Sequence, residues 1–165
     1  MFYPIFSWNM VSTTEIDISV RFLVPTNVIR EALTDVNAAQ YYTQSECLIE
    51  PKVGGRYNLY NNSIQGEFVS LTDNVIELKW RRREWDDNVY SSVTLQFTSI
   101  DSAVTEIHVH QTGIPKSDRY NNIGVAESVE KGWIDMIFRK ISMMLGYTFQ
   151  TEDEFEYNCL LIRYE

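Results

Sequence analysis

The chain has 165 residues, of which 44% are hydrophobic and 13% aromatic, and its formal net charge is −9. That length suits one globular domain, which can bury its own core without disulfides or metals. The negative charge argues against nucleic acid as a partner because phosphate binding depends on clustered cations. No apolar run reaches the roughly 18 residues that span a membrane. Cys47 and Cys159 match no metal-binding spacing, so we expect free thiols, a cytoplasmic location and no cofactor.

The N-terminal part predicts an extension, one strand and two short helices. Residues 1–12 are apolar and aromatic but lack the basic start and cleavage site of a signal peptide, so we treat them as an N-terminal extension. Residues 13–24 alternate apolar and polar side chains, which is typical of a half-buried strand. Thr26 and Asp35 are the expected N-caps of the two helices that follow.

The middle of the chain predicts an antiparallel meander. After an expected loop over residues 43–53, strands are predicted at residues 56–60, 63–71, 75–82, 89–100 and 104–112. Short turns join them, so consecutive strands should be antiparallel neighbours. The residues predicted to face inward are Tyr57, Leu59, Ile64, Phe68, Ile76, Leu78, Trp80, Val93, Leu95, Phe97, Ile107 and Val109.

A long amphipathic helix is predicted over residues 125–145. Its apolar side chains recur at three- and four-residue steps and include Trp133, Met136 and Ile137. Gly146 is a suitable C-terminal cap. Residues 148–165 form a C-terminal extension for which an added strand and disorder are both open. The order of elements predicts an α+β helix-grip fold, in which a curved antiparallel sheet packs on the long C-terminal helix.

A series of short motifs over residues 15–147 resembles one family. They are Gly54-Gly55, Ile64-x-Gly66-Glu67-Phe68, Leu78-Lys79-Trp80-Arg81 with Trp85, Thr94-Leu95-x-Phe97, Thr105-Glu106, Gly113-Ile114-Pro115, Gly132-Trp133 and Leu145-Gly146-Tyr147. Their order and spacing resemble the C-terminal domain of the activator of heat-shock protein 90 ATPase, a branch of the START-like (SRPBCC) superfamily. The resemblance places such a domain at residues 13–147.

This resemblance implies a co-chaperone that binds heat-shock protein 90 in the stress response, modulates its ATPase cycle and catalyses nothing itself. Full-length members carry another domain before this one, which docks on the chaperone. Nothing resembling that domain precedes Thr13. The resemblance therefore implies binding or modest modulation by this chain rather than strong activation.

The dense basic cluster near residue 81 is the predicted contact with a partner. Arg81, Arg82 and Arg83 are followed by Trp85 and Asp86. Cations interleaved with aromatic side chains can bind an acidic protein face or a single nucleic-acid strand, and we favour the protein. The other interpretation is that the cations form a solvated strand end. Reversing the charges should weaken chaperone binding without lowering the melting temperature.

Two further groups of residues offer weaker alternatives. Glu106, His108 and His110 share one strand face and could hold Zn²⁺, but a solvated outer face is the simpler interpretation and we predict no metal. Trp80, Trp133, Met136 and Ile137 could line a cavity for a small apolar ligand, the alternative function, although core packing is favoured. The sequence contains no nucleophile–base motif and no phosphate-binding glycine loop, so we expect no enzyme.

Overall fold

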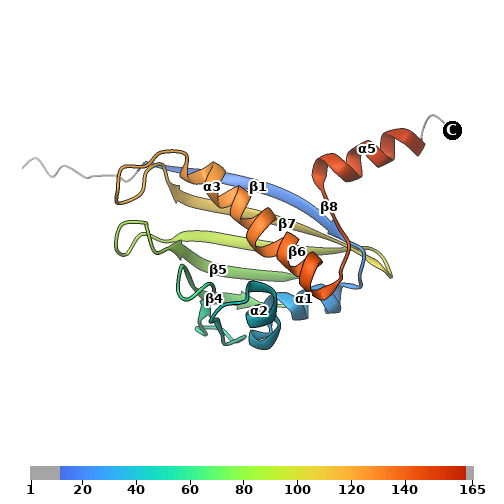
Figure 1. Cartoon of the computed structure of the whole chain (residues 1–165), viewed down its shortest axis with the longest axis horizontal. Coiled ribbons are helices and arrows are strands. Elements are labelled where there is room, and N and C mark those ends of the chain that lie inside the picture. The colour runs from blue at the N-terminus through green and yellow to red at the C-terminus, as the bar shows by residue number, and fades with distance from the viewer. Residues whose placement is uncertain (1–11, 163–165) are drawn as a thin grey trace, which may run out of the picture.

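The computed structural model describes residues 12–162 and contains one large antiparallel sheet. The strand order is β4-β5-β6-β7-β1-β8, and the strands are β1 (Thr13–Phe22), β4 (Ile64–Leu71), β5 (Val75–Arg82), β6 (Ser91–Asp101), β7 (Val104–Pro115) and β8 (Phe149–Thr151). Figure 1 shows the curved sheet with one long helix lying across its face. This arrangement is the predicted α+β helix-grip fold.

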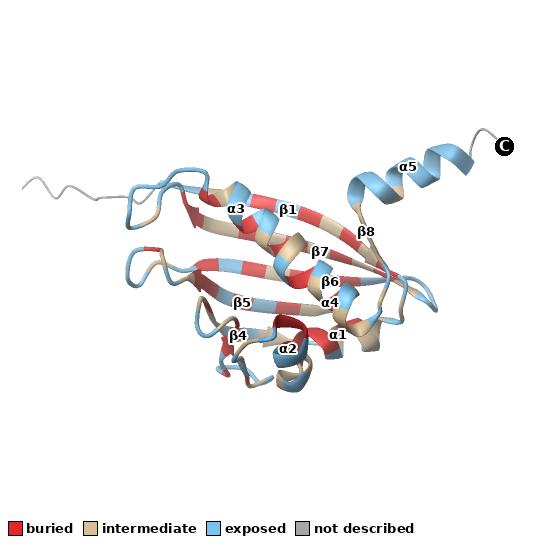
Figure 2. Cartoon of the chain, viewed as in Figure 1, coloured by how far each residue is buried: buried red, intermediate tan, exposed pale blue. Residues whose placement is uncertain are grey.

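The sheet forms because apolar and polar side chains alternate along its strands. Every strand residue predicted to face inward is buried, as are Ile16, Ile18, Val20 and Phe22 on β1. Figure 2 shows this alternation along the strands, and it shows the buried face of the long helix turned toward the sheet. The core therefore lies between the sheet and the helix, as the period of two predicts.

The long helix runs without a break from Val125 to Leu145, but its middle is not α-helical. It comprises α3 (Val125–Lys131), a π-helical turn η1 (Gly132–Phe138) and α4 (Arg139–Leu145). In η1, the Arg139 N–H donates to the Ile134 carbonyl, five residues earlier, and this wider turn changes which side chains face the sheet. Phe138 is buried, whereas Met136 is 43% exposed. The prediction that Met136 belongs to the apolar face is therefore wrong.

The two short helices are α1 (Thr26–Thr34) and α2 (Val36–Thr43). Asp35 caps α2 as predicted, since its Oδ1 accepts hydrogen bonds from the backbone N–H groups of Asn37 and Ala38. The prediction for Thr26 is wrong. The cap position of α1 is Pro25, and the Thr26 hydroxyl lies 3.1 Å from the Thr105 hydroxyl instead.

The segment before β4 forms a small second sheet. β2 (Leu48–Ile49) pairs with β3 (Tyr57–Asn58), so the expected loop over residues 43–53 contains a short strand. The strand predicted at 56–60 is reduced to two residues. Tyr60, Asn61 and Asn62 have positive φ angles, which ends the extended backbone and supports the predicted turn at the two asparagines.

The C-terminal segment adds a strand and a helix. β8 pairs with β1 at the sheet edge and is followed by α5 (Glu152–Ile162). The added strand is one of the two outcomes left open by the sequence, and the helix is not predicted. Residues 1–11, almost all of the expected N-terminal extension, lie outside the described part of the chain.

Candidate functional site

The candidate site lies at one end of the sheet, where two loops meet. Residues 83–90 connect β5 to β6, and residues 116–124 connect β7 to α3; both loops lie at the left in Figure 1. Arg119 joins them. Its backbone N–H donates to the Glu84 carbonyl at 3.0 Å, its Nε donates to the Trp85 carbonyl at 3.0 Å, and its Nη2 lies 2.9 Å from Asp87 Oδ1. Arg119 is not among the site residues predicted from the sequence.

Arg81 and Trp85 lie in the interior, which corrects their assignment as partner-binding residues. Trp85 is 0% exposed and packs edge-on against Trp80, with ring centroids 5.6 Å apart. Arg81 is buried, and its Nη2 donates to the carbonyls of Trp85 at 2.9 Å and Asp86 at 3.2 Å. Neither side chain is accessible to a partner, because the chain after β5 folds back over both of them. Arg81 therefore holds the loop in place.

Arg82 connects β5 to the long helix. Its Nη1 donates to the Ser128 hydroxyl at 2.7 Å, and its Nη2 donates to the Ser128 carbonyl at 2.8 Å. Desolvation lowers the pKa of Arg82, and Glu84 at 3.8 Å partly offsets that effect. Gly132 gives the guanidinium room, since a Cβ there would lie 2.4 Å from Arg82 Nη2. Arg82 is thus committed to an internal contact.

Arg83 and Asp86 are the two predicted partner-binding residues that are exposed. Two apolar side chains of the adjoining loop are also exposed, Tyr120 at 70% and Ile123 at 86%. Asp118 fixes the loop that carries both, because its Oδ1 accepts the backbone N–H groups of Tyr120 and Asn122 at 2.9 Å each. Hydrogen bonds from Asn122 to the Asp118 carboxylate lower its pKa. The sequence does carry a signal for this surface, because Tyr120 is aromatic and Ile123 is aliphatic within an otherwise polar loop.

A groove extends from this end along the helix. It has a volume of about 530 Å³ and lies between the turn after β3 and η1, with Tyr60, Ile64, Arg82, Glu84, Gly132 and Met136 in its walls. The Tyr60 hydroxyl donates to the Met136 carbonyl, and desolvation raises the pKa of Tyr60 to about 12. A hollow of about 210 Å³ continues past Arg82 and Glu84 to Ile123. We use "loop-end surface" for Arg83, Asp86, Tyr120 and Ile123.

Three of the four residues predicted to line a cavity are core residues. Trp80 and Trp133 stack on each other with ring centroids 6.1 Å apart, and Ile137 is 1% exposed. The space between helix and sheet at this point is filled with aromatic rings. The prediction of a cavity wall is corrected for these three residues, and Met136 contributes to the outer groove instead.

The histidines of β7 lie on the outer face of the sheet, as the solvated-face interpretation holds. His108 Nε2 and His110 Nδ1 each lie 2.9 Å from Asp17 Oδ1 on β1. The hydrogen bond with His110 lowers the pKa of Asp17. Glu106 pairs with Arg21 at 2.9 Å. Within residues 12–162, no group of three or more potential ligands is placed to hold a metal.

The curved antiparallel sheet closed by one long C-terminal helix defines a helix-grip domain of the START-like class. The family model described as "Activator of Hsp90 ATPase homolog 1-like protein" matches residues 24–146. The chain therefore belongs to the family of activators of Hsp90 ATPase, as the sequence motifs predict. Among the described residues, no helix is long and apolar enough to cross a membrane.

Individual relatives agree with this assignment. The chain is 32% identical to an activator of 90 kDa heat shock protein ATPase homolog from Dictyostelium discoideum over 72% of this chain, and 25% identical to homolog 1 from Homo sapiens over 83%. It spans only 29% and 38% of those two proteins. The crystal structure of PFC0360w, an HSP90 activator from Plasmodium falciparum, superposes with a TM-score of 0.78 at 33% identity, and it covers 82% of this chain and 99% of that one.

Proposed function

We propose that this chain binds the Hsp90 chaperone and modestly modulates its ATPase cycle through protein contacts, acting in the cytoplasm without chemistry of its own. One observation carries the proposal. The Plasmodium falciparum protein described as an HSP90 activator matches this chain along 99% of its own length. The solved chain of that activator thus corresponds to this domain over nearly all of its length, whereas this chain spans 29% and 38% of the two longer relatives.

We propose the loop-end surface as the contact with the chaperone. Tyr120 and Ile123 supply exposed apolar area on a loop fixed by Asp118, and Arg83 and Asp86 supply exposed charges on the adjoining loop. An aromatic residue on a preorganised loop loses little conformational entropy on binding, which favours such residues as interface anchors. The surface is exposed in the free chain and needs no rearrangement of the core.

The first test is a calorimetric titration of Hsp90 with this chain, with and without non-hydrolysable ATP, together with the ATPase rate. Binding with a small change in rate is the expected result. Absence of binding in both nucleotide states would refute the proposed function.

The second test locates the contact. Tyr120→Ser with Ile123→Ser should weaken binding, and Arg83→Glu should change its salt dependence. Matched controls are Tyr41→Ser, which removes an exposed tyrosine from α2, and Lys52→Glu, which reverses an exposed cation before β3. If the controls weaken binding as much as the loop-end variants, the contact lies elsewhere.

A further inference from the structure

β1 has a free edge over most of its length. It pairs with β7 from Thr13 to Phe22 on one side. On the other side, β8 pairs only with Val20, Arg21 and Phe22. Among residues 12–162, no strand lies beside Thr13–Ser19 on that side. Figure 1 shows β1 along the margin of the sheet and α5 turning away from it after β8.

The contacts of β8 establish which backbone groups face this edge. The Leu23 N–H donates to the Thr148 carbonyl at 2.9 Å, so residue 23 faces the β8 side. Along a strand, the N–H and C=O of alternate residues point to the same side. The register shift between β1 and β7 pairs Thr14 with Ile114 and Ile16 with Gln111, which puts the extra residue on β7 and leaves the alternation along β1 intact. The backbone groups of Glu15, Asp17 and Ser19 therefore face the free edge.

Edges of this kind can pair with a further strand, and β8 shows that this one accepts an antiparallel partner. Each of the three residues Glu15, Asp17 and Ser19 offers one donor and one acceptor. Neither a proline nor a bulge interrupts β1 between Thr13 and Ser19. The side chains of Glu15 and Asp17 are 64% and 57% exposed. The edge is therefore accessible to an incoming segment.

Charge selects the partner. Glu15 and Asp17 both project from the outer face of β1 and stay more than half exposed, on a chain with a net charge of −9. Asp17 Oδ1 also contacts His108 and His110 on the β7 side, so Glu15 is the carboxylate with fewer contacts. Opposite charges on adjacent strands stabilise pairing and like charges oppose it. A second copy, paired antiparallel in a register centred on Ile16, would place Glu15 opposite Asp17 at both ends. A self-pair is therefore disfavoured, and a basic segment is favoured.

We infer that the free edge of β1, Thr13–Ser19, binds an extended basic peptide segment of another protein, which adds to the sheet as an antiparallel strand in line with β8. Its alternate basic side chains lie over Glu15 and Asp17, and the residues between them point toward the inner face, where α3 contacts β1. The main-chain hydrogen bonds supply affinity and the two carboxylates supply selectivity. This inference does not depend on the proposed Hsp90 function.

The probe is a soluble seven-residue peptide of alternating lysine and valine, compared with a glutamate–valine peptide of the same length. Amide hydrogen exchange should slow at Glu15, Asp17 and Ser19 when the lysine peptide is added. Ile16 and Ile18, whose amides face β7, should change little. No slowing at the three edge amides, or equal slowing with the glutamate peptide, would overturn the inference.

Two variants separate backbone pairing from charge. Asp17→Pro removes one edge-facing N–H, which an edge strand tolerates, and should abolish protection by the peptide. Glu15→Lys should weaken lysine-peptide binding about three- to tenfold and strengthen glutamate-peptide binding, whereas Glu77→Lys on the exposed face of β5 should change neither. If Asp17→Pro does not fold, the peptide affinities of Glu15→Lys and Glu77→Lys still test the inference, and equal affinities for the lysine peptide would refute it.

Two other occupants are distinguishable outcomes. In the first, the edge amides exchange slowly in the free chain and become fast when residues 1–11 are deleted. That outcome would show that the chain covers its own edge. A concentration-dependent dimer in sedimentation that protects the same amides would show a second copy there. Either result refutes the inference of a basic partner.

Discussion

The Trp133 indole on the long helix donates its Nε1–H to Oε1 of Gln111 on β7, at 2.8 Å, and both side chains are fully buried. The Gln111 amide nitrogen donates in turn to Ser91 Oγ at 2.8 Å, and Ser91 donates to the Trp80 carbonyl at 2.8 Å. This chain of polar groups links the helix to three strands through an otherwise apolar core. Because each group is desolvated, each bond depends on its neighbour.

Replacing Gln111 should destabilise the domain. Gln111→Met keeps an unbranched chain but leaves the Trp133 N–H without an acceptor in the core, which costs about 1–3 kcal/mol of unfolding free energy. Urea denaturation followed by tryptophan fluorescence measures the loss. Gln96→Met, on the exposed face of β6, is the matched control and should change little. Equal stability of the two variants would mean that the network contributes nothing.

Gly132 and Arg82 should be energetically coupled. Alanine is a better helix former than glycine by about 1 kcal/mol, but a Cβ at position 132 would displace the Arg82 guanidinium from Ser128. Gly132→Ala should therefore stabilise the Arg82→Ala variant more than it stabilises the parent. A double-mutant cycle on thermal unfolding tests this. Additive effects would show that Arg82 moves aside without cost.

The neighbouring arginines Arg81 and Arg83 should behave in opposite ways. Arg81→Ala removes the donors to the carbonyls of Trp85 and Asp86 and leaves a void in the interior, so it should lower the melting temperature by several degrees. Arg83→Glu changes an exposed side chain and should leave the melting temperature within about one degree. A larger drop for Arg83→Glu than for Arg81→Ala would contradict the assigned roles.

The sequence predicted the sheet well because alternation depends on local pattern, and Tyr57, Trp80 and Val109 all follow it. It failed where a tertiary contact overrides the pattern. Gln111 is polar yet occupies an inward position because Trp133 and Ser91 satisfy it. Arg81 is charged yet buried because the following loop supplies carbonyls. The π turn that exposes Met136 has no signal in a three- and four-residue repeat.

Stability should fall between about pH 10 and pH 12 as tyrosines ionise. Burial raises the pKa of Tyr60 to about 12 and raises those of Tyr42 and Tyr57 as well, mainly by desolvation. In the unfolded chain these groups lose their protons near pH 10. Above that pH the unfolded state binds fewer protons than the native state, so the unfolding free energy decreases with pH. Tyr60→Phe should make this decrease shallower, as measured by urea denaturation at a series of pH values. An unchanged slope would mean that Tyr60 ionises alike in both states.

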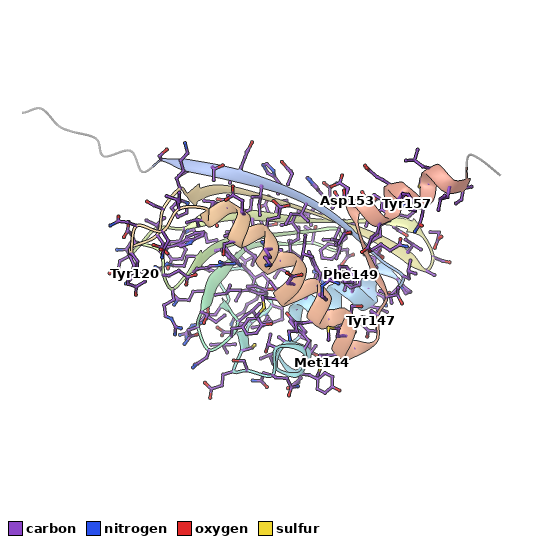
Figure 3. The ribbon with its side chains drawn as sticks, turned by 45° about the horizontal axis from the view of Figure 1, so that its top comes forward. Tyr120, Met144, Tyr147, Phe149, Asp153 and Tyr157 are labelled. Carbon is purple, nitrogen blue, oxygen red and sulfur yellow. The ribbon has the colours of Figure 1, made fainter. Side chains whose placement is uncertain are left out.

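Within the C-terminal segment, the residues up to Thr151 should stabilise the domain, whereas the residues after it should contribute little. Within residues 152–162 no side chain is buried, and α5 contacts the sheet through Phe155, whose ring centroid lies 4.3 Å from the Arg21 guanidinium. Such an exposed cation–π contact contributes about 0.5–1 kcal/mol. Figure 3 shows Asp153 and Tyr157 on the projecting helix, and Phe149 and Tyr147 against the body of the domain.

Truncation after Thr151 should therefore lower the unfolding free energy by no more than about 1 kcal/mol. Truncation after Tyr147 also removes β8 and the Phe149 ring, which stacks on Phe22 with centroids 5.5 Å apart. Loss of that packing and of the edge pairing should cost about 3–5 kcal/mol more, because Phe22 is fully buried between Phe149 and Phe138 in the native domain. Chemical denaturation of the two truncations measures the difference. A large loss already at the first truncation would show that α5 packs on the domain in solution.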